Sequence, residues 1–217
     1  MEIKAVILDC DGTMFDSERI WWDVWFAVGK EHGVVVPEEF LISITGSAPN
    51  KERNIQEEYP EIVGISPIVR ATGQKQFERI FTEKINIQKP GLDELITYLL
   101  QKNIKIAVAS NSATSHVFGL LNTTSFVNQL DAVTCREDVS KGKPDPEGLL
   151  KTAERLQVDP HHCLVIEDSK LGTQAAKNAE MHRIYIKDLV PKDEELESYI
   201  EFELKDLTEV IPFIEAL

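Results

Sequence analysis

The sequence predicts an α/β protein with a Rossmann-like parallel sheet core, helices on both faces of that sheet and an inserted all-helical domain. From residue 88 onward, short apolar runs alternate with segments of helical periodicity, and this β-α-β-α order is typical of a parallel sheet. Residues 17–87 interrupt the order, because they carry helical patterns throughout. We therefore expect a core of residues 1–16 and 88–217 and a separate helical domain of residues 17–87.

The first apolar run, Ile3–Leu8, is expected to form a buried strand that leads into a loop of acids and glycine. Side chains alternate between the two faces of an extended segment, so Asp9 and Asp11 project to one side and Cys10 to the other. Two converging carboxylates repel each other unless a cation or a shared proton relieves them. Open α/β sheets bind ligands at the carboxyl ends of their strands, and we expect a site there.

The inserted domain contains six aromatic residues at helical spacing. We interpret them mainly as helix-to-helix packing, with one or two facing the strand ends. They are Trp21, Trp22, Trp25, Phe26, Phe77 and Phe81. The expected helices of this domain are Glu18–His32 (ended by Gly33), a short helix from Pro37, one near Asn50–Glu58 and one from about Ser66 to Lys84.

The remaining elements alternate regularly, and each helix has an apolar stripe for packing on the sheet. The first of these helices follows Pro90-Gly91, and another begins after Asp145-Pro146, with proline at the first helical position. The expected strands are 104–109, 132–134, 162–166 and 183–186, and further helices cover 114–121 and 172–179. Nine acids against two lysines in residues 188–209 indicate a solvated acidic face.

Composition limits the classes of protein to consider. The net charge of −14 argues against a nucleic-acid partner, which needs a basic surface. No apolar run approaches the roughly 20 residues that cross a bilayer, and we expect no signal peptide before the first strand. We expect a monomeric, cytoplasmic protein that has no contact with membranes.

Three cysteines, Cys10, Cys135 and Cys163, make an odd count without C-x-x-C spacing. All three lie in or beside apolar runs, so we expect buried, reduced thiols that behave as small hydrophobic side chains. A zinc site is not expected.

Polar or reactive clusters follow the expected strands, where a parallel sheet gathers them along one edge. This inventory of carboxylates, hydroxyls, amides and a lysine suits Mg²⁺, a hard cation that is commonly shared with a substrate phosphate. Ser110, the backbone N–H groups after it and Lys143 are expected to hold the phosphate oxygens, which leaves Asp9 to attack phosphorus. The clusters are Asp9 with Asp11, Ser110–Ser112, Lys141–Pro146 and Glu167–Ser169.

Each cluster taken alone also has an ordinary structural interpretation. Ser110–Ser112 could cap the start of a helix, and Glu167 with Asp168 could form an acidic helix cap. Lys143 could be a solvated lysine in a loop. Four such clusters after consecutive strands in one chain argue against coincidence.

These clusters resemble the motifs of the haloacid dehalogenase superfamily, in the β-phosphoglucomutase-like branch with a helical cap inserted after the first strand. The resemblance covers nearly the whole chain and is specific for the family, not for a substrate. The matching segments are Asp9–Glu18, Ser110–Ser112, Lys143–Pro146 and Ile166–Ser169.

The resemblance implies a role for each site residue. Asp9 is implied as the nucleophile that forms an aspartyl-phosphate, and Asp11 as the acid that protonates the leaving oxygen and then deprotonates water. Mg²⁺ is implied to bind Asp9, the backbone carbonyl of Asp11 and Asp168, while Glu167 holds a metal-bound water. Lys143 is implied to neutralise charge on Asp9 and the phosphoryl group, and Ser110 with Asn111 to bind phosphate.

The departures from the branch favour hydrolysis over transfer. Dehalogenases and phosphonatases of this superfamily lack an acid at the position of Asp11, so its presence favours phosphate esters as substrates. Sugar phosphomutases carry a cap histidine where this chain has Trp21. We expect a Mg²⁺-dependent phosphatase acting on a small phosphorylated metabolite such as a sugar phosphate. The alternatives are a β-phosphoglucomutase-type mutase and a non-catalytic protein that binds a phosphometabolite.

Overall fold

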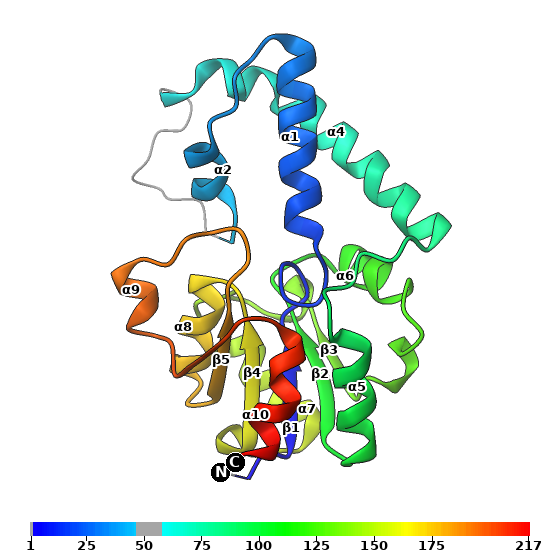
Figure 1. Cartoon of the computed structure of the whole chain (residues 1–217), viewed down its shortest axis with the longest axis vertical. Helices are drawn as coiled ribbons and strands as arrows, with labels where there is room; N and C mark the ends of the chain where they lie inside the picture. Colours follow the sequence, from blue (N-terminus) through cyan, green and yellow to red (C-terminus); the bar gives the residue numbers. More distant parts are fainter. Residues whose placement is uncertain (1, 47–57) are drawn as a thin grey trace.

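The computed structural model describes residues 2–46 and 58–217, which form a parallel sheet core and a layer of helices above it (Figure 1). The sheet has six strands in the order β3-β2-β1-β4-β5-β6, and each neighbouring pair is parallel. Both chain ends lie at the opposite end of the core from the cap helices. The strands are β1 (Ala5–Leu8), β2 (Lys105–Ala109), β3 (Ala132–Thr134), β4 (Cys163–Glu167), β5 (His182–Ile186) and β6 (Phe202–Leu204).

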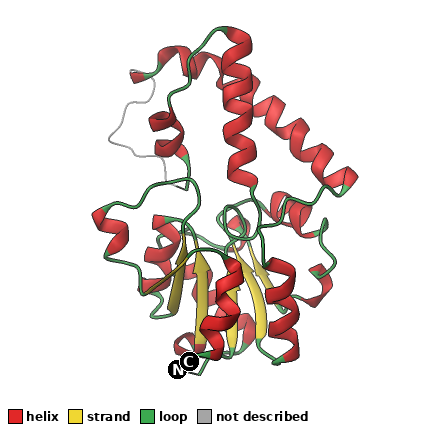
Figure 2. Cartoon of the chain, in the orientation of Figure 1, coloured by secondary structure: helices red, strands yellow, loops and turns green. Residues whose placement is uncertain are grey.

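Helices cover both faces of the sheet (Figure 2), which confirms the expected fold class. The core helices are α5 (Leu92–Gln101), α6 (Thr114–Leu121), α7 (Glu147–Leu156), α8 (Lys170–Asn178), α9 (Glu194–Glu197) and α10 (Val210–Glu215). Short 3-10 turns, η1 (Val127–Gln129), η2 (Arg136–Asp138), η3 (Pro160–His162) and η4 (Leu207–Glu209), join several of them.

The central strand β1 is buried on both faces, and its residues alternate between two hydrophobic clusters. Val6 and Leu8 pack with residues of α5 and α6, whereas Ala5 and Ile7 pack with residues of α7 and α8. The period-two alternation of an extended chain produces this division. Because β1 lies between β2 and β4, the end of β1 faces the crevice where open α/β sheets bind ligands.

The cap consists of α1 (Ser17–His32), α2 (Glu38–Ile44) and α4 (Pro60–Glu83). Gly33 ends α1 in the left-handed conformation, with φ of 68°, as a C-terminal glycine commonly does. Trp22 and Phe40 lie in a cap cluster of their own, while Phe77 belongs to the main core cluster. Phe26 is the exposed one of the six aromatic residues, with 43% of its surface accessible, and its ring contacts that of Trp22 edge to face at a centroid distance of 6.5 Å.

Helix α4 begins six residues earlier than the sequence pattern predicts. Proline is favoured in the first turn of a helix, which made Ser66-Pro67 a natural start, but Pro67 lies inside α4 and Pro60 occupies its first position. Pro67 has no N–H to donate to the carbonyl of Val63. The hydroxyl of Ser66 donates to that carbonyl at 2.8 Å instead, so the helix continues.

Two further segments, residues 188–209 and the region near Asn50–Glu58, bear on the predicted elements. Strand β6 was not expected, since residues 188–209 were assigned to an acidic solvated face; Phe202 and Leu204 nonetheless pair with β5 at the sheet edge. The helix expected near Asn50–Glu58 lies outside the described residues except for Glu58 itself.

Two antiparallel linkers join the cap to the core. The backbone N–H of Asp16 donates to the carbonyl of Ile87 at 2.9 Å, and that of Lys89 donates to Met14 at 2.8 Å. The Lys89 ammonium also binds Asp16 and Asp188, at 2.7 and 2.6 Å. These contacts bind the two linker segments to each other and to the loop after β5.

All three cysteines are buried free thiols, as expected. Among the described residues, no helix combines the length and the apolar character needed to cross a bilayer.

Candidate active site

The ends of β1, β2 and β4 meet beneath the cap. Asp9 follows β1, Ser110 follows β2, and Asp168 follows β4. They line a cavity of about 530 Å³, and Ile44 and Gly46 of the cap line it as well. Of the predicted site residues, six line this cavity, and Glu167 lies beneath it with 1% of its surface exposed. The six are Asp9, Asp11, Ser110, Asn111, Lys143 and Asp168.

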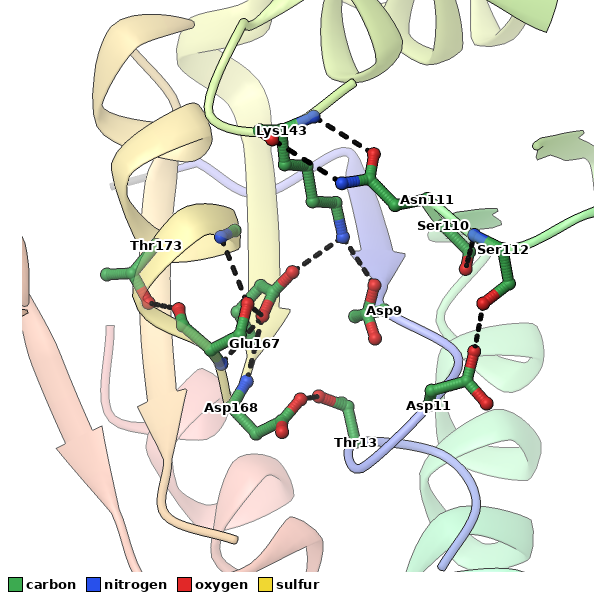
Figure 3. Close-up of polar contacts among 12 residues, drawn as sticks. Asp9, Asp11, Thr13, Ser110, Asn111, Ser112, Lys143, Glu167, Asp168 and Thr173 are labelled. Carbon is green, nitrogen blue, oxygen red and sulfur yellow. Dashed lines mark hydrogen bonds and ion pairs between the residues drawn. The ribbon is translucent and has the colours of Figure 1, made fainter. Parts of the chain in front are cut away.

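Lys143 reaches from the loop before α7 to a position between two carboxylates (Figure 3). Its ammonium donates to Asp9 and, at 2.6 Å, to Oε1 of Glu167. Burial alone would lower the pKa of Lys143, but these two carboxylates hold it well above its ordinary value. Lys143 is therefore a buried cation, and the alternative of a solvated loop lysine is excluded.

Glu167 organises the end of β4 through its second oxygen. Oε2 accepts hydrogen bonds from the backbone N–H groups of Asp168 and Ser169, at 3.0 and 2.9 Å, and from the Ser169 hydroxyl at 2.9 Å. Gly172 makes room for this arrangement, because a Cβ atom at that position would collide with the Glu167 carboxylate. The carboxylate thus links the Lys143 loop to the start of α8.

Asp168 is held from the opposite side by the loop that follows β1. The hydroxyl of Thr13 donates to Oδ1 of Asp168 at 2.8 Å. Gly12 adopts a φ of 81°, and a Cβ atom there would lie 2.7 Å from Cγ of Asp168. A glycine is therefore required both by the left-handed backbone and by the closeness of the carboxylate.

The charges at these strand ends suit a bound cation. Asp9, Glu167 and Asp168 each offer a carboxylate oxygen, and these atoms lie within 4.8 Å of one another. Burial raises the pKa of Asp9 and of Asp168 well above the ordinary value. The Lys143 ammonium opposes this shift at Asp9, and neighbouring carboxylates add to it at both residues. Lys143 is the ammonium that directly contacts this group. A hard divalent cation with oxygen ligands would supply the missing positive charge.

Asp11 is held separately, by three donors. Oδ1 accepts from the Ser17 hydroxyl at 2.6 Å and contacts Nε2 of His116 at 2.9 Å, while Oδ2 accepts from the Ser112 hydroxyl at 2.6 Å. Burial alone would raise the pKa of Asp11, but these hydrogen bonds and the charge of His116 bring it below its ordinary value. The carboxylate is consequently fixed in direction.

Sequence reasoning missed the contacts that Ser17 and His116 make with Asp11. Ser17 lay inside the first family-like segment, and His116 follows Ser112 by four residues, in the first turn of α6. A histidine one helical turn beyond a strand-end cluster was the available signal. The contact between His116 and Asp11 could not be predicted from this signal, because it depends on how α6 packs beside the end of β1.

Ser110 and Asn111 were expected to bind phosphate. The Ser110 hydroxyl accepts from the backbone N–H of Ser112 at 3.0 Å and remains on the cavity wall. The Asn111 side chain borders the same cavity and also hydrogen-bonds the backbone of Lys143: Oδ1 accepts from its N–H at 2.9 Å, and Nδ2 donates to its carbonyl at 3.5 Å. In this arrangement Asn111 supports the loop that delivers Lys143.

Comparisons with known proteins show the family to which this chain belongs. The family model described as haloacid dehalogenase-like hydrolase matches residues 6–186. A phosphorylated carbohydrates phosphatase of Thermotoga maritima is 31% identical over 183 residues, with 84% of each chain covered. A β-phosphoglucomutase of Bacillus subtilis is 28% identical over 196 residues, covering 84% of this chain and 82% of that protein.

Among solved structures, a β-phosphoglucomutase from Clostridium difficile has the same fold. Its TM-score is 0.73 at 21% sequence identity, and the match covers 99% of this chain and 96% of that one.

Proposed function

We propose that this chain, which belongs to the haloacid dehalogenase-like hydrolase family, is a Mg²⁺-dependent phosphatase that hydrolyses a small phosphorylated carbohydrate. The observation that carries the proposal is the arrangement around Asp9. Its carboxylate is paired with Lys143 and lies in one cavity with a second, separately held carboxylate, Asp11.

In the first half of the proposed reaction, an oxygen of Asp9 attacks phosphorus and the bond from phosphorus to the ester oxygen breaks. An aspartyl-phosphate forms on Asp9. Hydrogen bonds lower the pKa of Asp11 in the free protein, but the anionic phosphate group of a bound substrate favours its protonated form, and Asp11 then transfers this proton to the departing alkoxide oxygen. Lys143 lowers the repulsion between the carboxylate and the phosphoryl oxygens. Ser110 and the backbone N–H groups that follow it hold those oxygens.

In the second half, Asp11 removes a proton from a water molecule as its oxygen attacks the phosphorus of the aspartyl-phosphate. The bond between phosphorus and Asp9 breaks, which releases inorganic phosphate and regenerates the carboxylate. Asp11 regains in this step the proton that it lost in the first, so the cycle balances.

Asp9, Asp168 and the backbone carbonyl of Asp11 would hold the proposed Mg²⁺. When bound, the ion would supply Lewis-acid chemistry that offsets negative charge on the transferring phosphoryl group. The buried, mutually repelling carboxylates of Asp9 and Asp168 support such a site. Both oxygens of Glu167 are already engaged, by Lys143 and by Asp168 and Ser169, which favours an indirect role for Glu167.

A sugar phosphomutase is the alternative, since β-phosphoglucomutases are among the similar proteins. The cap argues for water as acceptor. Trp21 of α1 packs against Phe77, with ring centroids 5.4 Å apart, and covers Gly73. It also lines a small cavity beside Asp11, so α1 offers an indole and not an imidazole at this position. His116 of α6 borders the same cavity, but its Nε2 atom is bound to Asp11.

The test is phosphate release from a panel of phosphorylated sugars, nucleotides and glycolytic acids, with Mg²⁺ present. We expect release from at least one sugar phosphate by the wild-type protein and none by Asp9→Asn. Incubation of β-glucose 1-phosphate with catalytic β-glucose 1,6-bisphosphate tests the alternative. Formation of 6-phosphate much faster than free phosphate would establish the mutase, and binding without turnover would establish a non-catalytic protein.

A further inference from the structure

His116 connects the Asp11 carboxylate to the cap. It lies in the first turn of α6, and its Nε2 atom is 2.9 Å from Oδ1 of Asp11. The two side chains are 22% and 16% exposed, so solvent competes little for this contact. The proposed chemistry gives His116 no step of its own.

The other faces of the imidazole meet aromatic rings of the cap helix α4. The ring centroid of Phe77 lies 5.0 Å from that of His116 at an interplanar angle of 67°, and that of Phe81 lies 6.0 Å away at 70°. Both are edge-to-face contacts of the kind that aromatic rings favour. Since Phe77 and Phe81 lie four residues apart, they project from the same face of α4.

A glycine in α6 allows the end of α4 that carries Phe81 to pack closely against it. Gly119 lies one turn after His116, and a Cβ atom there would be only 2.6 Å from the ring of Phe81. The absence of a side chain at 119 allows Phe81 to lie against α6 beside the imidazole. The cap therefore contacts the core at the residue that touches Asp11.

We infer that His116 is a positioning residue: it fixes the direction of the Asp11 carboxylate, and the α4 rings of the cap fix His116. The inference rests on the proposed function, because it concerns how Asp11 delivers a proton to the leaving oxygen. It goes further by assigning a role to a core histidine and to the cap aromatics Phe77 and Phe81.

The distribution of donors explains why this contact matters. Oδ2 of Asp11 is bound by Ser112, which belongs to the core, whereas Ser17, which donates to Oδ1, is the first residue of the cap helix α1. His116 is the contact to Oδ1 that the core supplies. Without it, Ser17 of the cap is the remaining hydrogen-bond partner of Oδ1 among the residues that the structure describes.

The test uses the dependence of the rate on the leaving group. The constant kcat/KM reports the steps up to formation of the aspartyl-phosphate. In those steps an alkyl phosphate needs a proton from Asp11, and p-nitrophenyl phosphate, with its stable leaving anion, does not. A misaligned acid therefore slows the sugar phosphate selectively, whereas damage to Asp9 or Lys143 slows both substrates.

For His116→Ala we expect kcat/KM to fall about 10- to 100-fold with the sugar phosphate, the scale of a 1 Å misplacement, and by a few-fold at most with p-nitrophenyl phosphate. His116→Gln, which keeps an N–H donor near the position of Nε2, is expected to restore most of the loss. Phe81→Leu should give a smaller loss with the same selectivity.

The matched control is His161→Ala, since the His161 side chain is 67% exposed and lies in η3, before β4 begins. This variant should leave kcat/KM unchanged for both substrates. Asp11→Asn provides the reference for selective loss. One outcome would overturn the inference but not the acid role of Asp11. In it, Asp11→Asn lowers kcat/KM selectively for the sugar phosphate, whereas His116→Ala either leaves kcat/KM unchanged or lowers it equally for both substrates. Equal loss of both substrates in Asp11→Asn would overturn the acid role of Asp11, and the inference with it. Wild-type protein inactive on every phosphate ester would refute the proposed function itself.

Discussion

Glu167 and Lys143 form a buried ion pair in which Oε1 lies 2.6 Å from Nζ, with only 1% and 10% of the two side chains exposed. The same ammonium contacts Asp9, so one cation balances two carboxylates from neighbouring strands. Removing one member of a buried pair leaves the other charge without compensation, which costs more than the pair itself contributes. The stability of the core and the charge of the proposed nucleophile therefore depend on the same lysine.

Lys143→Met should destabilise the protein and abolish phosphatase activity. Loss of the ammonium leaves Asp9 and Glu167 facing each other in a buried site, at a cost of about 3 kcal/mol. Urea unfolding measures the first effect and phosphate release the second. Lys141→Met is the control, because Lys141 lies two residues away with 76% of its side chain exposed; it should leave both unchanged. A fully active Lys143→Met protein would contradict the proposed role.

Gly172→Ala should also disturb the site, although residue 172 does not border the cavity. Its Cβ atom would collide with the Glu167 carboxylate, and the displaced carboxylate would release Lys143. We expect a loss of about 2 kcal/mol in unfolding free energy together with reduced turnover. Gly64→Ala is the matched control in an exposed part of α4 with free space around it. It should stabilise the protein by up to about 1 kcal/mol.

Asp9→Asn should eliminate turnover without unfolding the protein, because it removes the attacking charge and preserves the shape of the side chain. Asp11→Asn is expected to reduce turnover roughly 10²–10⁴-fold, the usual range for a general acid or base. Phosphate release and thermal unfolding measure the two effects. Wild-type activity in Asp9→Asn protein, with contamination ruled out, would be incompatible with an aspartyl-phosphate on Asp9.

Removal of divalent metal should abolish activity, and Mg²⁺ should restore it. Ca²⁺ is expected to inhibit, because it accepts more ligands in looser geometry and would hold Asp9 out of line for attack. Activity measured after chelation, and again after each metal is added back, tests this. Undiminished turnover in excess chelator would remove the metal site at Asp9, Asp11 and Asp168 from the proposal.

Glu18 should make stability depend on pH near neutrality. Burial, followed by the negative charges of Asp11 and Asp188, raises the pKa of Glu18 from 4.5 to about 7. Between these values the folded protein holds a proton that the unfolded chain has released, so the unfolding free energy falls as pH rises through this window.

Glu18→Gln removes the ionisation and should raise the unfolding free energy at about pH 8 by the order of 1 kcal/mol, with no gain at about pH 4. Urea unfolding at several pH values measures the difference. Glu94→Gln, in the exposed first turn of α5, is the control and should follow the wild-type profile. A gain that is the same at both pH values would show that packing, not charge, explains the effect.

Local patterns predicted most of the fold because strand and helix periodicity are properties of short segments. The apolar run before Asp9 and the stripe of α5 needed no tertiary information. The start of α4 was missed for a local reason, because the hydroxyl of Ser66 satisfies the carbonyl that Pro67 leaves unbonded and the helix continues through the proline. Strand β6 did need tertiary information, since Phe202 and Leu204 are isolated apolar residues in an acidic stretch and become a strand by pairing with β5.

The order of strands and polar clusters along the chain predicted which chemical groups lie close together, because parallel strands place their carboxyl ends at one edge of the sheet. Asp9, Ser110 and Asp168 follow their strands directly, whereas Lys143 lies in the longer loop between β3 and α7. How these groups pair depends on the tertiary structure. It placed Glu167 under Lys143, turned Asn111 toward the Lys143 backbone, and brought His116 to Asp11 across 105 positions of sequence. Such contacts depend on the packing of distant helices and loops over the sheet, and no local periodicity records that packing.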